Sequence, residues 1–230
     1  MPLPKIDLPL FDITLPLSGI KTHYRPFTVR EEKILLIAQQ TDDIDAIMNS
    51  LQQILSNCMA TTDITKLSAL EAEYAFIKIR SSSVNNVIAL TITDKHGKTV
   101  PISANLDEIE IAHNPEHSRL VKVSDTAAIK LSYPTLDQVA MLLKEESEAV
   151  YSDLVVNCIE QIIVNDELFD ANTATRDELI EFMNGLPSKA IEALEKFFLT
   201  MPKLKLEIPY KDSAGVDGVF VIEGLKSFFR

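Results

Sequence analysis

Apolar residues follow this chain in two rhythms, and each rhythm predicts a different secondary structure. In the first rhythm they recur every three or four residues, which is typical of a helix that buries one face. The clearest example is 44–59, where one apolar stripe runs beside Asp45, Asn49 and two glutamines. Helices of this kind are predicted at 28–40, 44–59, 67–80, 135–144, 154–163, 175–184 and 188–201.

In the second rhythm apolar and polar residues alternate, which is typical of strands with one buried face. Residues 3–29 alternate imperfectly around Ser18 and Gly19, so we expect a hairpin that turns there. The prolines of this segment lack the N–H that a ladder needs and fit only edge positions, which leaves the arm open to another chain. Further strands are predicted at 87–93, 99–102, 109–112, 119–123, 127–131, 203–210 and 216–222.

Residues that favour helix ends support these boundaries. Asn184-Gly185 is expected to end one helix in the left-handed conformation, and Ser188 to cap the next. The run 81–83 consists of serines, whose hydroxyls compete for backbone hydrogen bonds, and is expected to stop the third helix. Three pairs match the capping box, in which two side chains cap each other's backbone N–H: Thr28 with Glu31, Thr135 with Gln138, and Thr175 with Glu178.

Together these elements predict an α+β fold, with amphipathic helices packed with an N-terminal hairpin, a small antiparallel sheet and a C-terminal hairpin. We divide the chain into an N-terminal hairpin plus helices at 1–85, an antiparallel β segment at 86–133, and a helical segment ending in a β hairpin at 134–230. A single domain over 1–230 is the alternative. The sequence does not decide whether the β segment is inserted between helical halves or shared with the N-terminal hairpin.

Charge excludes one class of partner. The chain has 22 basic and 34 acidic residues and a net charge of -12 at pH 7, which repels phosphate backbones. No apolar run has the length of a membrane span, and prolines interrupt the apolar core that a secretory signal would need. Two cysteines make no disulfide framework, as in proteins that fold in a reducing cytoplasm. We therefore expect neither nucleic-acid nor membrane partners.

Residue types that carry catalysis or bind metals are scattered. His113 and His117 are four apart, but Pro115 breaks the helix that would bring them together, so we expect a loop pair of solvated histidines. Cys58 and Cys158 fall on apolar helix stripes, where a thiol packs as a small hydrophobe. Six glycines leave no phosphate-cradling loop. The prediction is a protein without catalytic residues, cofactor or metal, and hence not an enzyme.

One constellation suits protein binding. Tyr24, Arg25 and Phe27 combine a guanidinium with two aromatic rings in a segment stiffened by Pro26. These three residues are our candidate partner-binding site, because Tyr and Arg are enriched in interface hot spots. The competing interpretation is internal: Tyr24 and Phe27 pack the hairpin onto the first helix, while Arg25 pairs with an acid of the same chain.

Three blocks of the chain carry a family resemblance. The first is 1–7 (MPLPKID) with 24–36 (YRPFTVREEKILL), and the second is 70–84 (LEAEYAFIKIRSSSV). The third is 197–203 (FFLTMPK) with 223–229 (EGLKSFF). In this combination and order the chain resembles the base plate protein family of T-even-like contractile-tailed bacteriophages, whose founding member is a baseplate hub assembly protein. Some relatives carry paired cysteines in the last hairpin, but 211–218 contains none, so we expect no zinc there.

What the resemblance implies is a non-enzymatic role in building the baseplate hub. Our leading hypothesis is an assembly chaperone for hub or tape-measure proteins, at work in the host cytoplasm. The alternative is a retained structural subunit of the hub, located in the baseplate of the virion tail. A third hypothesis, a cell-wall hydrolase that uses paired carboxylates, is weak because acid pairs abound in a chain with 34 acids. The oligomeric state and the identity of the hub partners stay open.

Overall fold

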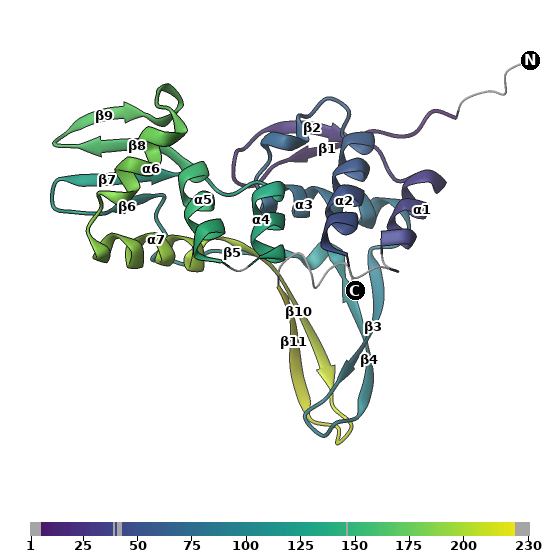
Figure 1. Ribbon diagram of the computed structural model, residues 1–230. Coiled ribbons are helices and arrows are strands. Elements are labelled where there is room, and N and C mark those ends of the chain that lie inside the picture. The colour runs from purple at the N-terminus through teal and green to yellow at the C-terminus, as the bar shows by residue number, and fades with distance from the viewer. Residues whose placement is uncertain (1–5, 39, 41–42, 146, 224–230) are drawn as a thin grey trace, which may run out of the picture. The chain divides into compact units, whose positions relative to one another are not determined.

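The computed structural model describes residues 6–38, 40, 43–145 and 147–223, which fall into two compact units (Figure 1). Unit 1 takes Met1–Ala112 together with Lys203–Arg230, and unit 2 is His113–Pro202. The chain therefore leaves unit 1, builds unit 2, and returns. Helices and small antiparallel sheets occur in both units, which confirms the predicted α+β class. No helix of the described ranges has the length and apolarity needed to cross a bilayer.

Three helices form the body of unit 1 within the described ranges. Helix α2 is capped by Asp43, whose carboxylate accepts from the Asp45 N–H, and α3 begins with a capping box of Ser68 and Glu71. Each helix buries the residues on one stripe, and α2 contacts both α1 and α3. The helices are α1 (Val29–Ala38), α2 (Ile44–Cys58) and α3 (Ala69–Ser83), with short 3-10 turns at Ile64–Lys66 and Leu106–Glu108.

The described strands of unit 1 form three separate sheets. The N-terminal hairpin pairs β1 (Phe11–Thr14) with β2 (Lys21–Tyr24) around a turn that includes Gly19, as predicted. A second hairpin pairs β3 (Val87–Thr93) with β4 (Thr99–Asn105). The third sheet has the order β11-β10-β5. Its members are β5 (Glu110–Ala112), β10 (Lys203–Lys211) and β11 (Asp217–Glu223).

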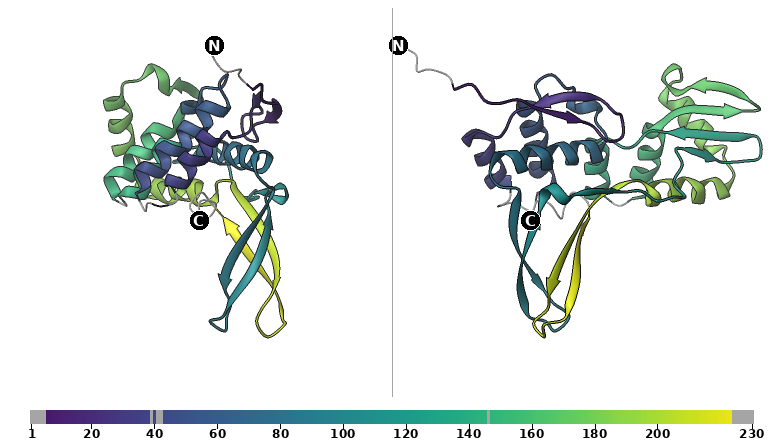
Figure 2. Two further views of the ribbon diagram at one scale, coloured as in Figure 1. Left: turned by 90° about the vertical axis from the view of Figure 1, so that its right-hand side faces the viewer. Right: turned by 180° about the vertical axis from the view of Figure 1, so that it is seen from behind.

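Two of these hairpins, β3–β4 and β10–β11, run side by side away from the helices of unit 1 (Figures 1 and 2). Strand β10 contacts β4, and the apolar positions of both strands are buried at every second residue. Alternation of this kind places one face of each hairpin against the other and leaves the opposite face to solvent. We call this pair of hairpins the β arm.

Unit 2 packs four helices with one four-stranded antiparallel sheet of order β6-β7-β8-β9. Its core is apolar and includes Ile129, Leu131 and Leu194, none of which is exposed. The strands are β6 (Leu120–Lys122), β7 (Ala127–Leu131), β8 (Ile159–Val164) and β9 (Glu167–Asp170). The helices are α4 (Leu136–Lys144), α5 (Glu148–Cys158), α6 (Arg176–Asn184) and α7 (Ser188–Thr200), with a 3-10 turn at Ala171–Thr173.

The prediction of one helix over 154–163 is wrong for its second half. Helix α5 ends at Cys158, and β8 begins at once with Ile159. This strand reads IEQIIV, and its β-branched side chains favour extended backbone over helix. Asn165 and Asp166 then adopt positive φ angles of 50° and 68°, as a tight hairpin turn requires, and lead into the unpredicted strand β9.

The strands between 86 and 133 do not form a sheet of their own. β3 and β4 pair with each other, β5 pairs with β10, and β6 and β7 join the sheet of unit 2. β5 has only three residues, so its partner is decided by packing with a segment far along the chain rather than by a local turn. The individual strands were predicted, but the pairing of β5 with β10 and of β7 with β8 was not.

Three predicted helix ends differ in detail. Helix α3 continues through the serine run, because Ser82 and Ser83 donate their hydroxyl protons to the carbonyl of Ile79 and so stay compatible with the helix. Gly185 has a φ of -81° and continues the right-handed turn, since its N–H still bonds to carbonyls of α6. The cap of α7 is Pro187, and Ser188 is the first helical residue.

Candidate functional site

The candidate binding residues lie at a corner of unit 1, where β2 ends and α1 begins. Tyr24 is buried and stacks on Phe11, with ring centroids 5.6 Å apart. Phe27 packs against Phe76 of α3 at 5.9 Å. Both aromatic residues thus turn toward unit 1 itself.

At the same corner, Arg25 forms a two-pronged ion pair with Glu31 of α1. Its Nη2 lies 3.0 Å from Oε1, and its Nη1 lies 3.2 Å from Oε2. The Glu31 side chain is only 1% exposed and that of Arg25 is 24% exposed. The pair is therefore largely removed from water, where a fork of two hydrogen bonds gives both energy and fixed geometry.

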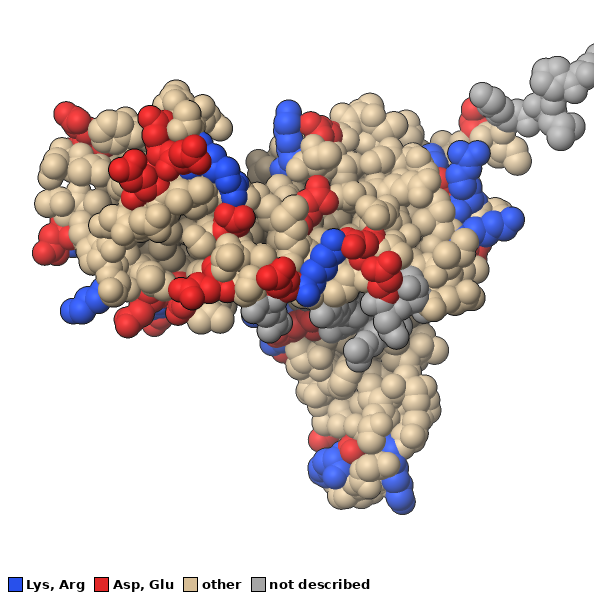
Figure 3. Space-filling model, viewed as in Figure 1, with Lys and Arg blue, Asp and Glu red and all other residues tan. Residues whose placement is uncertain are grey.

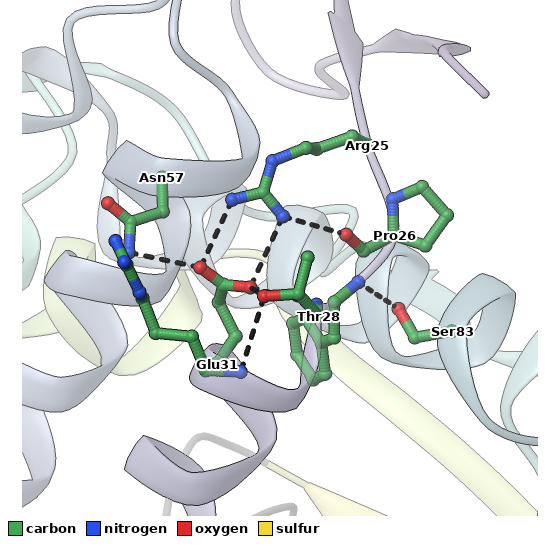
Figure 4. A network of polar contacts seen from close by, with 8 residues as sticks. Arg25, Pro26, Thr28, Glu31, Asn57 and Ser83 are labelled. Carbon is green, nitrogen blue, oxygen red and sulfur yellow. Dashed lines mark hydrogen bonds and ion pairs between the residues drawn. The ribbon is translucent and has the colours of Figure 1, made fainter. Parts of the chain in front are cut away.

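Backbone groups of the corner are also held, as Figure 4 shows. The Arg25 N–H donates to the Cys58 carbonyl at 3.0 Å, and the Phe27 N–H donates to Ser83 Oγ at 2.7 Å. Asn57 Nδ2 donates to Glu31 Oε1 at 3.2 Å, and the Thr28 N–H donates to Oε2 at 2.8 Å. Of the predicted capping box, the half made by the Glu31 side chain is thus present, whereas Thr28 Oγ1 accepts from the Arg30 N–H at 3.3 Å. The network reaches α2 and α3.

Electrostatics at the corner favour the charged carboxylate. Burial by itself would raise the pKa of Glu31, but hydrogen bonds from Arg25 and Thr28 outweigh it and lower the pKa to about 2. Hydrogen bonding to Glu31 likewise raises the pKa of Arg25. The corner therefore holds a permanent ion pair at physiological pH rather than a group ready to exchange protons.

The structure places Arg25 in an intrachain pair, as the internal interpretation expected, and leaves about a quarter of its side chain at the surface. Contact of Tyr24, Arg25 or Phe27 with another protein stays a prediction. The corner has a second consequence, because it diverts the chain after Tyr24 into α1. Residues 6–10, which precede β1, pair with no strand of the described residues. They are exposed, and Ile6 is 87% exposed.

A second cluster of polar contacts joins the two tips of the β arm. Asp94 Oδ1 accepts from the backbone N–H groups of His96 and Lys98, both at 2.9 Å, and its Oδ2 accepts from the Ser213 N–H of the other tip at 2.9 Å. Conversely, Lys95 of the first tip forms an ion pair with Asp212 of the other tip, with Nζ 3.0 Å from Oδ2. Each aspartate is buried and organises its own turn while bonding the opposite one.

These contacts lower the pKa of both aspartates. The largest influence on the pKa of Asp94 is its hydrogen bond from Ser213. The largest influence on the pKa of Asp212 is its hydrogen bond from the Val216 N–H. The charges left at the surface of the tips are mostly those of the lysines Lys95, Lys98 and Lys211. Figure 3 shows the end of the arm with atoms of Lys and Arg in blue beside some acidic atoms in red. The arm thus ends in basic side chains on an otherwise acidic protein.

Asp94→Ala is expected to loosen the tips without unfolding the helices. The Ser213 N–H loses its acceptor on the other hairpin, so hydrogen exchange at this amide should quicken by roughly tenfold. In acid the wild type should likewise lose protection at this amide, measured as exchange relative to the intrinsic rate at the same pH: a carboxylate with a lowered pKa contributes fully above its unfolded pKa and loses that contribution as the pH falls. Exchange measured residue by residue by NMR tests both, with Asp125→Ala in the β6–β7 turn as the control. Unchanged exchange at Ser213 would contradict the contact.

Other candidate chemistry has structural explanations. His117 is half-buried rather than solvated: its ring bonds to Thr200 Oγ1 and the Tyr133 hydroxyl, each at 3.0 Å, while His113 is exposed. Burial raises the pKa of the Cys58 thiol to about 11 and that of Cys158 to about 12, as packed cysteines require. Within the described ranges no three His, Cys, Asp or Glu side chains gather as a metal site would need.

Sequence reasoning missed the partners that define both clusters. Asn57 and Ser83 belong to helices far along the chain from Arg25, and no local pattern marks them. For the tips a signal did exist. Both turns read Asp-x-x-Gly, at 94–97 and 212–215, and the two glycines have positive φ angles of 75° and 81°.

Comparison with known proteins gives one match. A family model described as T4 bacteriophage base plate protein matches residues 8–230. No curated protein and no solved structure matches the chain. The match covers both units and includes the corner and the β arm.

Proposed function

This chain belongs to the T4 bacteriophage base plate protein family, and from that membership we propose that it assembles the baseplate hub without catalysing a reaction. It acts as a chaperone that holds hub or tape-measure proteins in the host cytoplasm until the hub closes. The observation that supports a role in the baseplate is the family match, which spans nearly the whole chain.

Surface properties support a role in holding other proteins. Large apolar side chains are exposed on residues 6–10 ahead of β1, on α1, on the outer face of β11 and on β9. Contiguous exposed apolar positions commonly mark protein interfaces. The net charge of -12 disfavours nucleic acid and opposes non-specific association of the chain. The exposed residues are Ile6, Leu10, Leu36, Ile37, Leu168, Phe169, Val219 and Val221.

Co-expression tests the chaperone role. We expect the chain to co-purify with one or more hub proteins of the same phage and to keep them soluble, whereas a tail protein from outside the hub should not co-purify. The proposal fails if none of the hub proteins binds and hub assembly proceeds without the chain.

A retained hub subunit is the second candidate, and the family description itself favours it, because it names base plate proteins. Mass spectrometry of purified mature tails separates the two roles. The chaperone should be absent from the tail, or present well below the amount of the hub proteins. Stoichiometric presence would overturn the chaperone and establish the subunit.

A further inference from the structure

Strand β3 has a free edge, because no other described strand pairs with the side that faces away from β4. Backbone hydrogen bonds just beyond this ladder show which groups lie on the free edge. The Asp94 N–H donates to the Lys98 carbonyl at 2.8 Å, and the Leu106 N–H donates to the Asn86 carbonyl at 2.7 Å. Bonded and unbonded pairs alternate in an antiparallel ladder, so the even-numbered residues of β3 bond to β4. Its odd-numbered residues, from 87 to 93, therefore direct their backbone N–H and C=O groups outward.

This edge lacks the features that usually keep an edge strand from pairing with another chain. Natural sheets protect their edges with charged residues, prolines or very short strands. β3 is seven residues long, reads VIALTIT, and contains no charge, no proline and no glycine. Every other edge strand of the described sheets contains a charged residue or a proline, for example Pro101 in β4 and Asp217 in β11. The edge of β3 is thus the unprotected one among them.

The side chains that β3 directs into the β arm are also incompletely covered. Leu90 is only half-buried, while its partner Ile102 on β4 is 6% exposed. Ile88 is likewise half-buried, while its partner Ala104 is fully buried. The apolar interior of the arm therefore thins out toward the free edge, and a further strand there would bury both side chains.

An apolar groove of unit 1 lies at the start of the same strand. It has a volume of about 210 Å³, and β3 contributes two residues to its lining. For comparison, an engineered apolar cavity of about 150 Å³ accepts a benzene molecule, so the groove has room for a large apolar side chain. The apolar lining consists of Phe27, Leu35, Leu36, Val84, Val87 and Ile88, and the polar lining of Glu32, Arg80 and Asn85.

We propose that β3 and this groove together bind an extended segment of a baseplate hub protein. The segment adds a strand to the free edge of β3, and where it passes Val87 it places an apolar side chain in the groove. In this binding mode the backbone hydrogen bonds give affinity, and the pocket for a side chain gives specificity. The inference rests on the proposed function, because it names the surface through which the chain holds a hub protein.

A second copy of this chain fits the surface less well. If 87–93 paired antiparallel with the same residues of a copy, centred on Leu90, the residues after Thr93 of the copy would lie beside the groove. Those residues are Asp94 and Lys95, which are charged, whereas most of the groove lining is apolar. The occupant that suits both parts of the surface is a segment that stays apolar where it leaves β3.

A proline on the free edge tests the strand pairing. Ala89→Pro removes an outward N–H that the hairpin does not use, and Pro101 and Pro209 already occupy outward positions on β4 and β10. We expect the affinity for the hub protein found by co-expression to fall by roughly tenfold or more, measured by biolayer interferometry with full-length chains. Val221→Pro makes the same change on the free edge of β11 and should leave the affinity unchanged. Thermal melts of both variants show whether they fold equally well.

A charge in the groove tests the pocket. Leu36→Asp places a carboxylate in the apolar lining and should also weaken binding by roughly tenfold. The matched control is Ile37→Asp, because Ile37 is an exposed apolar neighbour on the same helix that does not line the groove. It should bind like the wild type.

Hydrogen exchange locates the contact directly. In the free chain the outward amides of Ala89 and Thr91 should exchange much faster than that of Leu90, which is bonded to β4. Saturation with the hub protein should slow both outward amides by at least tenfold. Val219 and Val221, on the edge of β11, should keep their exchange rates.

Three results would overturn the inference while leaving the chaperone role standing. One is a hub protein that binds the wild type and Ala89→Pro equally well. Another is an equal loss of affinity in Ala89→Pro and Val221→Pro. The third is a wild-type chain that dimerises by itself and becomes monomeric in Ala89→Pro, because the occupant would then be a second copy. A wild-type chain that binds no hub protein would overturn the proposed function, and this inference with it.

Discussion

Arg25→Ala is expected to lower the free energy of unfolding by roughly 3–5 kcal/mol, the usual cost of removing one partner from a buried ion pair. Glu31 would remain with its side chain 1% exposed, having lost both prongs of its strongest partner. Urea unfolding measures the loss. The matched control is Arg30→Ala, which removes an exposed arginine on the first turn of α1 and should cost less than about 0.5 kcal/mol.

The pH dependence of that loss identifies its cause. The folded pKa of Glu31 is lowered to about 2, so the pair contributes fully above the ordinary glutamate pKa near 4.5 and loses its contribution as the pH falls toward 2. The gap between wild type and Arg25→Ala should therefore be largest near neutral pH and narrow in acid. A gap independent of pH would assign the effect to lost packing of the arginine stem instead.

Glu73→Gln is expected to act in the opposite direction and stabilise the protein by roughly 3 kcal/mol at pH 9. Glu73 lies on α3 with 7% exposure, and its Oε1 finds no hydrogen-bond partner in the described part of the chain. Burial raises its pKa to about 8. Above that pH the folded protein must hold an unpaired charge in its interior, which glutamine avoids.

The sign of the pH effect follows from proton binding. Between about pH 4.5 and 8 the folded chain keeps a proton on Glu73 that the unfolded chain has lost, so wild-type stability should fall across this window and then level off. Glu73→Gln should remove this decline, as thermal melts from pH 5 to 9 would show. A decline that persists in the variant would exclude Glu73 as its source.

The neighbouring glutamate provides a control of opposite sign. Glu71 is equally buried, but its carboxylate accepts from the N–H of Ser18 at 2.7 Å and of Leu17 at 3.2 Å. It also completes the capping box of α3. Glu71→Ala should therefore destabilise the protein by about 1–2 kcal/mol, while the change two residues further on stabilises it.

Local chemistry was readable from the sequence, and contacts between distant segments were not. The stripe at 44–59 predicted α2 closely, because its apolar spacing fits only a helix. At 154–163 the spacing fitted a helix as well, but the β-branched residues after Cys158 and the turn at Asn165 decide for a strand. Periodicity alone cannot tell whether a short apolar segment after a helix is a buried strand or a continuation of that helix.

The corner shows the same limit for the site. The sequence identified Tyr24, Arg25 and Phe27 as a unit and offered an internal and an external interpretation. Choosing between them requires the position of Glu31, which follows Arg25 by six residues with Pro26 in between. It also requires the positions of Asn57 and Ser83, which lie on other helices. That Glu73 Oε1 has no hydrogen-bond partner among the described residues is likewise not visible without the packing that buries it.

The return of the chain from unit 2 into unit 1 determines an order of events during synthesis. Ala112, the last residue of unit 1 before the excursion, is paired directly with Lys203, the first residue after it. All residues of unit 2 leave the ribosome before β10 and β11 do, and domains generally fold as units during translation. The pairing of β5 with β10 can therefore form only after every residue of unit 2 has been synthesised, and the sheet of β5, β10 and β11 cannot be completed before then.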